Sequence, residues 1–255
     1  MNRRKYLATA AGTGLAALAG CSTAVGEVAP PSVPEDQLEE EGWEQTDENQ
    51  RTVFEKEYGP VTVTAKSHSL TYSDTALRGD VREKTLGEVD TQMAVFSATH
   101  IDFGPDLNNL PANVGRKEIL DQTEQSAREQ FVGRMNDAGI EDVSQTETGT
   151  IEVKNGDASH TVYEGRKPIP EMTASVPGDE TVTVDLDDVA IAGELAVWND
   201  GDYVLVGGGA YPAENVADNV DRELSDAISV SMDIDLGLTP DGYQEEVRNL
   251  IGGVK

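Results

Sequence analysis

Apolar and polar residues alternate along much of the chain, and this period of two predicts β-strands. In residues 61–66 (VTVTAK) every second side chain is apolar, as expected for a strand with one buried face. Residues 52–58 and 61–72 flank Gly59-Pro60 and predict a hairpin. Further strands are predicted at residues 93–103, 150–153, 161–163, 180–186, 194–198 and 203–211.

Short turn sequences separate several of these strands. Asn155-Gly156 lies between residues 150–153 and 161–163, and NDGD at residues 199–202 joins the last two predicted strands. Asn-Gly and Asp-Gly pairs favour tight hairpin turns, because both accept positive φ angles. Strands joined in this way run antiparallel, so the sequence predicts an antiparallel sheet.

The spacing of apolar residues changes from two to about four in residues 116–138, which predicts a helix. Gly139 follows as its expected end. The stripe on one side of this helix consists of Leu120, Thr123, Ala127, Phe131 and Met135.

Two more helices are predicted toward the C-terminus. Residues 213–230 place Val216, Val220, Leu224 and Ala227 or Ile228 on one face. A short helix is predicted over residues 240–251. Thr239 precedes it as the N-cap, Pro240 stands at its first position, and Gly252 ends it.

These elements predict an α+β fold. We expect a single domain over residues 37–255, with an antiparallel β-sheet packed by two main amphipathic helices plus a short C-terminal helix. The element order resembles the fold of the PsbP family, the extrinsic photosystem II protein and its relatives. The likeness is greatest at AVWNDGDYVLV, residues 196–206, and the predicted helix at 216–228. The resemblance implies a central antiparallel sheet between helices, and it transfers no site residues.

The N-terminus predicts export. Arg3 and Arg4 precede a weakly apolar stretch at residues 6–19, which resembles a twin-arginine (Tat) signal. This stretch is too short, and too rich in Ala, Gly and Thr, for a stable membrane span. Residues 1–20 are therefore predicted to be a signal peptide.

The predicted signal peptide ends in a sequence that resembles a lipobox. Leu18, Ala19 and Gly20 are small or aliphatic residues that admit the signal peptidase, and Cys21 is the predicted lipid attachment site. Cys21 is the only cysteine, so no disulfide forms within the chain. Residues 22–36 are small and Pro-rich, and with Cys21 they predict a lipidated, flexible spacer over residues 21–36.

The charge of the chain indicates adaptation to high salt. There are 19 Lys and Arg against 48 Asp and Glu, a formal charge of −29, and the acids are spread along the whole chain. Repulsion among so many carboxylates opposes compaction in dilute buffer. At 1 M salt the Debye length is about 3 Å, which screens that repulsion. The combined pattern resembles small lipoproteins of haloarchaea.

The same charge excludes one class of partner. DNA or RNA binding needs a basic patch that displaces counterions from phosphates, and the sequence has none. The expected partners are the membrane, through the lipid anchor, and an unknown protein or small molecule. The predicted location is the extracellular face of the cell membrane.

Other candidate chemistry is weak. His68, His100 and His160 lack the spacing of zinc ligands, and Asp185, Asp187 and Asp188 do not continue as a calcium loop; nor do Asp233 and Asp235. Gly207, Gly208 and Gly209 lack the lysine of a phosphate-binding loop, so a bend or close helix packing explains them better. We assign no catalytic residue and expect no metal or cofactor.

Two function classes remain open. The first is a non-catalytic binding or envelope-associated domain of unknown ligand, tethered to the membrane. The alternative is an extracellular hydrolase or small-ligand-binding enzyme with a site built from scattered acids and histidines. The alternative requires at least two of His68, His100 and His160 to converge in one pocket.

Overall fold

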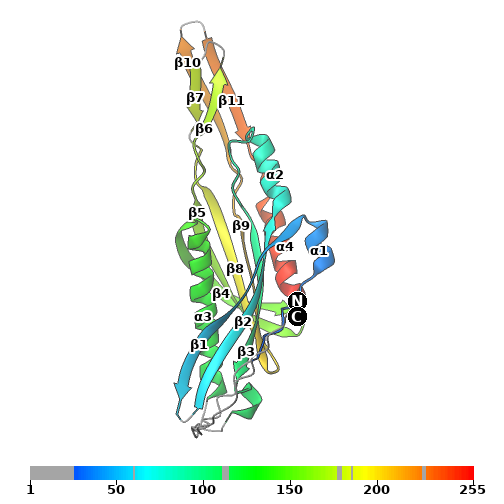
Figure 1. The fold of residues 1–255 in the computed structure, drawn as a ribbon. Helices are drawn as coiled ribbons and strands as arrows, with labels where there is room; N and C mark the ends of the chain where they lie inside the picture. The colour runs from blue at the N-terminus through cyan, green and yellow to red at the C-terminus, as the bar shows by residue number, and fades with distance from the viewer. Residues whose placement is uncertain (1–25, 60, 111–114, 177–179, 185, 226–227) are drawn as a thin grey trace, which may run out of the picture.

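The computed structural model describes residues 26–255 except 60, 111–114, 177–179, 185 and 226–227. Its centre is a seven-stranded antiparallel sheet with the strand order β1-β2-β3-β9-β8-β5-β4 (Figure 1). The strands are β1 (Trp43–Tyr58), β2 (Val61–Asp74), β3 (Val95–Gly104), β4 (Glu141–Val153), β5 (Gly156–Lys167), β8 (Val189–Asp200) and β9 (Tyr203–Pro212). The α+β prediction with an antiparallel sheet is confirmed.

Two small hairpins complete the strands. β6 (Met172–Val176) pairs with β7 (Glu180–Val184), and β10 (Ala217–Ser225) pairs with β11 (Ile228–Asp235). Each forms a two-stranded sheet of its own. The strand predicted at residues 180–186 corresponds to β7.

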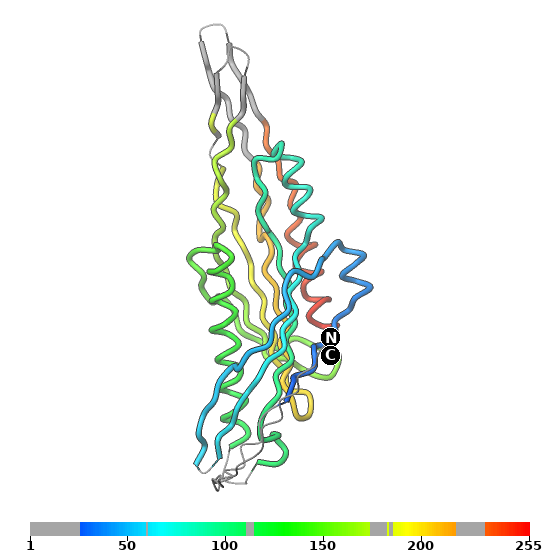
Figure 2. Tube along the Cα trace, viewed as in Figure 1, coloured from blue at the N-terminus to red at the C-terminus, as the bar shows by residue number. Residues whose placement is uncertain are grey.

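Helices lie on both faces of the large sheet. α3 (Arg116–Asp137) covers one face, while α1 (Glu35–Glu40), α2 (Thr75–Lys84) and α4 (Pro240–Gly253) lie on the other side (Figures 1 and 2). A 3-10 turn (Leu107–Asn109) precedes α3. Among the described residues, no helix has the length and apolar character needed to cross a membrane.

The run of three glycines on β9 explains how both faces are packed so closely. Side chains alternate across a strand, so Gly208 faces α3 while Gly207 and Gly209 face α4. A Cβ on Gly208 would lie 2.9 Å from Phe131 of α3, and one on Gly209 would lie 2.7 Å from Val247 of α4. The glycines therefore permit close helix packing, and they lie within the strand rather than at its end.

The helix predicted over residues 213–230 is wrong. The chain there forms β10 and β11, which pair with each other. A spacing of four fits one face of a strand as well as a helix, because four is a multiple of two; Val216, Val220 and Leu224 satisfy both periods. Ile228–Asp235 (ISVSMDID) alternates strictly, which is typical of a strand. The PsbP resemblance rested partly on this helix and loses that support.

The other two predicted helices are confirmed. α3 spans residues 116–137, ends before Gly139 at φ +77°, and buries Phe131 and Met135 of the predicted stripe. α4 begins at Pro240 after Thr239 and ends at Gly253, close to the predicted Gly252. α2 was not predicted; the Asp74 carboxylate caps it by accepting from the Leu77 amide at 2.8 Å.

Part of the predicted spacer is packed on the domain. Val28 is only 2% exposed, and its carbonyl oxygen accepts a hydrogen bond from His68 Nδ1 at 2.8 Å. Ser32 and Lys255 exchange two backbone hydrogen bonds of 2.8 and 2.9 Å. Apolar burial and this pairing with the chain end fix residues 28–34, and α1 begins at Glu35, just before the predicted domain start at Gln37.

Candidate functional site

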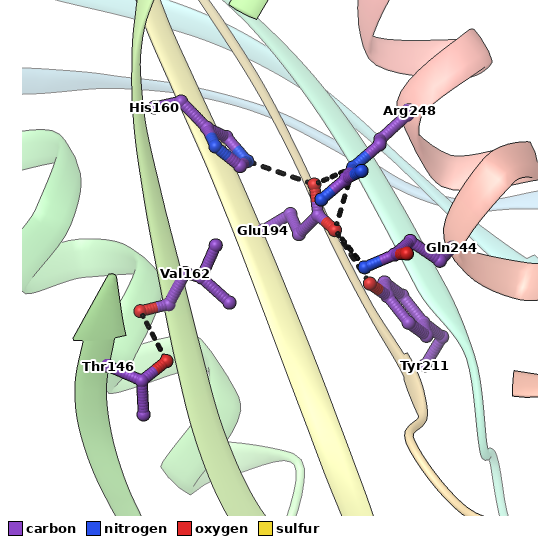
Figure 3. Close-up of polar contacts among 7 residues, drawn as sticks. All are labelled: Thr146, His160, Val162, Glu194, Tyr211, Gln244 and Arg248. Atoms are coloured by element: carbon purple, nitrogen blue, oxygen red, sulfur yellow. Dashed lines mark hydrogen bonds and ion pairs between the residues drawn. The ribbon is translucent and has the colours of Figure 1, made fainter. Parts of the chain in front are cut away.

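A buried carboxylate, Glu194 on β8, lies at the junction between the sheet and α4 (Figure 3). Its side chain is fully buried. His160 Nε2 donates to Oε2 at 2.9 Å, and Tyr211 Oη donates to Oε1 at 2.7 Å. From α4, Gln244 Nε2 donates to Oε1 at 3.2 Å, and Arg248 Nε donates to both oxygens at 3.1 and 2.8 Å.

These contacts keep Glu194 ionised. Burial alone would raise its pKa, but the hydrogen bonds from His160, Arg248 and Tyr211 outweigh burial and lower the pKa to about 2. The same arrangement raises the pKa of Tyr211, first through burial, then through its hydrogen bond to Glu194 and the Glu194 charge. The cluster is therefore an ionised carboxylate surrounded by donors.

The Glu194 cluster is suited to structure rather than to reaction chemistry. Both carboxylate oxygens already accept bonds from protein donors, so neither is free to act as a base or nucleophile. Its partners come from β5, β9 and α4, which are far apart in the sequence. Figure 3 also shows Thr146 Oγ1 donating to the Val162 carbonyl at 3.4 Å, a contact of the β4 edge. We assign the cluster to joining α4 to the sheet.

A second polar group lies where α4 meets the start of β1. Trp43 Nε1 donates to Glu246 Oε1. Burial raises the pKa of Glu246, the Trp43 bond lowers it, and the nearby Glu41 and Asp74 carboxylates raise it further, to about 7. Glu246 therefore takes up a proton near neutral pH.

The opposite face of the sheet holds a cavity, which we call the α3 groove. It has a volume of about 330 Å³ and lies between α3, β1 and the central strands. α3 contributes Phe131, Arg134 and Met135, and β9 contributes residues 208–210. Polar side chains of β1 and β2 complete it, among them Thr46, Asn49 and Thr71. An apolar wall with a few polar groups is the usual composition of a ligand pocket.

Arg134 of α3 is the basic residue among those that line the α3 groove. It also lines an adjoining space of about 30 Å³ that extends toward Ile101 and Leu195. Burial lowers the pKa of Arg134, the Arg51 charge lowers it further, and Asp47 raises it. None of the ion pairs among the described residues includes Arg134. The groove therefore contains a half-buried guanidinium with no carboxylate bound to it.

The three histidines do not come together. His68 and His100 lie directly opposite each other on β2 and β3, but His160 is on β5, with β9 and β8 between. At about 4.8 Å between neighbouring strands, three strand steps separate His160 from His100 by about 14 Å. The sheet therefore brings together two of the three predicted histidines.

Protein groups contact each histidine ring. His68 Nε2 lies 2.7 Å from Glu48 Oε1, and His100 Nε2 lies 3.2 Å from Asp102 Oδ1. The ring of His100 also packs on Tyr203, with ring centroids 4.4 Å apart. Within the described part of the chain, no three His, Cys, Asp or Glu side chains form a group that could hold a metal ion.

The residues predicted for export and lipid attachment lie outside the described residues. They are Arg3, Arg4, Leu18, Ala19, Gly20 and Cys21. Glu194 and Arg134, the two residues on which the sites described above depend, were not predicted as site residues. Glu194 stands alone among the apolar residues of VAIAGELAVW on β8, a pattern that indicates a buried carboxylate. Arg134 adjoins the Phe131–Met135 stripe of α3, a much weaker signal because helix surfaces often carry arginine.

Comparisons with known proteins give a family but no activity. No curated protein and no solved structure matches the chain. A family model matches residues 30–255, from the packed segment before α1 to Lys255. The chain therefore belongs to the family described as "Domain of unknown function (DUF6517)".

Proposed function

We propose that this protein is an exported, lipid-anchored binding domain of a halophile, and that its α3 groove holds a small ligand. The observation that carries the ligand-binding role is the groove itself, an apolar cavity of about 330 Å³ with Arg134 among its lining residues. Pockets for small molecules begin at about 300 Å³, so the groove suits a compact ligand.

The anchor is supported by the order of features at the N-terminus. Arg3 and Arg4, the apolar stretch and the lipobox at residues 18–21 occur in the order that export and lipidation require. The high-salt habitat is supported by the formal charge of −29 spread over the chain. Both resemble the small lipoproteins of haloarchaea. The PsbP likeness in element order adds no ligand to this proposal.

The non-catalytic role is preferred to a hydrolase. Glu194, the most strongly perturbed carboxylate on the sheet, has both oxygens occupied by protein donors. His160, whose ring contacts Glu194, lies three strand steps from His100, and neither His68 nor His100 lines the α3 groove. A hydrolytic site would need an acid or base with a free position facing a cavity.

The anchor is tested by membrane partition in a halophilic host. Wild-type protein should fractionate with membranes, and Cys21→Ser should be released. Ser22→Ala, one residue away, should stay with the membrane as the control. Equal partition of wild type and Cys21→Ser would contradict the lipid anchor.

The binding role is tested with a chemically diverse fragment library. Amide chemical shifts are recorded on the mature domain in molar KCl, and binders should shift groove amides such as Gly208, Gly209 and Ala138. Thr46→Trp places a large side chain at an exposed lining position, so it should weaken these shifts. Glu44→Trp, on the same strand but outside the groove, is the matched control. A library with no binder at these amides contradicts the ligand-binding role.

A further inference from the structure

The charge inside the α3 groove indicates which ligands it binds. Arg134 donates one side-chain hydrogen bond among the described residues, from Nη2 to Ser69 Oγ at 3.4 Å. Ser69 is itself fully buried and shares a 2.8 Å hydrogen bond with Thr99 Oγ1. A guanidinium carries five N–H donors, so most of the donors of Arg134 are left for a ligand.

A second guanidinium reinforces this charge. Arg51 of β1 donates to Gln130, which lies one helical turn before Arg134 on α3. The Arg51 charge lowers the pKa of Arg134. Two arginines therefore lie near each other, although the chain has only 19 Lys and Arg against 48 Asp and Glu. Arg51 is exposed and does not line the groove, so salt screens its charge more than that of the half-buried Arg134.

Two carboxylates also line the groove, and their negative charge disfavours the binding of an anion. They are Asp47 and Asp137, and both side chains are exposed. Molar salt screens exposed charges strongly and partly buried charges much less. The half-buried Arg134 therefore determines the charge preference inside the groove.

The rest of the groove sets the size and polarity of the ligand. Val95, Phe131, Met135 and Ile140 give it apolar walls. Its volume of about 330 Å³ equals about eleven water molecules at roughly 30 Å³ each, which corresponds to about ten to twelve non-hydrogen atoms. A free inorganic ion would leave these apolar walls unfilled.

We infer that the α3 groove binds a small monocarboxylate with a compact apolar body of about ten to twelve non-hydrogen atoms, and that Arg134 holds the carboxylate. This inference rests on the proposed ligand-binding function. A planar guanidinium pairs with a carboxylate through two parallel N–H···O bonds, whereas a dianionic phosphate would place a second charge against apolar walls. Phenyl or branched alkyl groups suit the apolar part.

The test uses four probes that separate charge from shape. They are 4-phenylbutyrate, 4-phenylbutanol, 4-phenylbutylamine and inorganic phosphate, each titrated into the mature domain at one KCl concentration. Affinity is measured from the shifts of the Gly208, Gly209 and Ala138 amides. We expect 4-phenylbutyrate to bind about tenfold or more tightly than the alcohol, the gain that one charged hydrogen-bonded pair gives. The amine and phosphate should bind more weakly still.

Variants assign the preference to Arg134. Arg134→Gln should remove the advantage of 4-phenylbutyrate over the alcohol, and Arg134→Lys should retain part of it. Arg128→Gln is the matched control, because Arg128 lies on the same helix, pairs with Glu124 at 2.5 Å and does not line the groove. Thermal unfolding of each variant confirms that it is folded.

The outcomes that overturn the inference are distinct from those that overturn the proposed function. Equal binding of acid and alcohol, preference for the amine, tight binding of phosphate alone, or an Arg134→Gln variant with unchanged selectivity each contradicts it. So does failure of all four probes in a domain whose groove binds other fragments. In these cases the groove remains a binding site, for a ligand of different chemistry.

Discussion

Arg248 Nε donates to both carboxylate oxygens of Glu194, at 3.1 and 2.8 Å, and so joins helix α4 to strand β8. The carboxylate is fully buried, while the arginine side chain is 45% exposed. Because water reaches only one partner, loss of Glu194 and loss of Arg248 have different costs. Removal of Arg248 leaves a buried carboxylate with one charged donor fewer.

Glu194→Gln should therefore lower the free energy of unfolding by about 3 kcal/mol, within the range for breaking a buried charged pair. The amide keeps the shape of the side chain, but it places an NH₂ group toward donors such as His160 or Arg248. Urea unfolding in molar KCl measures the change. Glu164→Gln, at an exposed position of β5, should change stability by less than about 0.5 kcal/mol. Equal effects of the two substitutions would contradict the role given to Glu194.

Acid should destabilise the domain through the same carboxylate. The pKa of Glu194 is lowered in the folded state, to about 2 from its usual 4.5, so its ionised form favours folding. This contribution is complete above about pH 4.5 and is lost as the pH falls toward 2. Wild type should lose stability more steeply than Glu194→Gln across that window, as followed by circular dichroism. Parallel pH profiles would show that another group controls acid unfolding.

Glu246 should have the opposite pH dependence. Its pKa is raised in the folded state, to about 7, so its protonated form favours folding and stability falls as the pH rises from about 4.5 through 7. Glu246→Gln retains an acceptor for Trp43 Nε1 and removes the charge near Glu41 and Asp74. We expect it to raise stability at pH 8 by about 1 kcal/mol, an estimate reduced for partial solvent exposure. Glu245→Gln, its exposed neighbour on α4, is the control.

The glycines of β9 should not tolerate a methyl group. Gly209→Ala would place Cβ 2.7 Å from Val247 Cγ1 and 3.0 Å from the Val95 carbonyl oxygen. We expect a loss of about 1 to 3 kcal/mol, as for overpacked core positions. Gly149→Ala on the exposed strand β4 has nothing within 4 Å and should be neutral or slightly stabilising. Thermal unfolding compares the two, and an equal response would show that α4 moves away at little cost.

Dilution of salt should unfold the mature domain. The chain carries a formal charge of −29, and the Debye length lengthens from about 3 Å at 1 M salt to about 30 Å at 0.01 M. Repulsion among surface carboxylates then acts across the whole domain. Far-UV circular dichroism during stepwise dilution of KCl measures the loss. A cooperative thermal transition retained in tens of millimolar salt would contradict the halophilic interpretation of the charge.

The sheet could largely be predicted from the sequence because its turns are encoded locally. Gly156 and Gly201 adopt positive φ angles of 141° and 66° at the two predicted hairpin turns. The element after β9 could not be assigned by spacing alone, since Val216 and Val220 fit both a helix and a strand. Strict alternation in Ile228–Asp235 was the decisive local signal.

The sites were harder to predict because they depend on contacts between distant segments. Glu194 and Arg248 are 54 residues apart, and only the packing of α4 on the sheet makes them partners. The role of Arg134 follows from its place between α3 and β1, which no short motif encodes. For these two sites, the lone carboxylate in the apolar strand β8 was the stronger sequence signal.

The pairing of Ser32 with Lys255 has a mechanical consequence. The two backbone hydrogen bonds join the segment that enters the domain directly to the last residue, beside α4 and the buried Val254. A force that pulls on the residues before Ser32 therefore acts on these two hydrogen bonds before it reaches β1 at the edge of the sheet. The start of the domain is thus held by the C-terminal segment as well as by the burial of Val28.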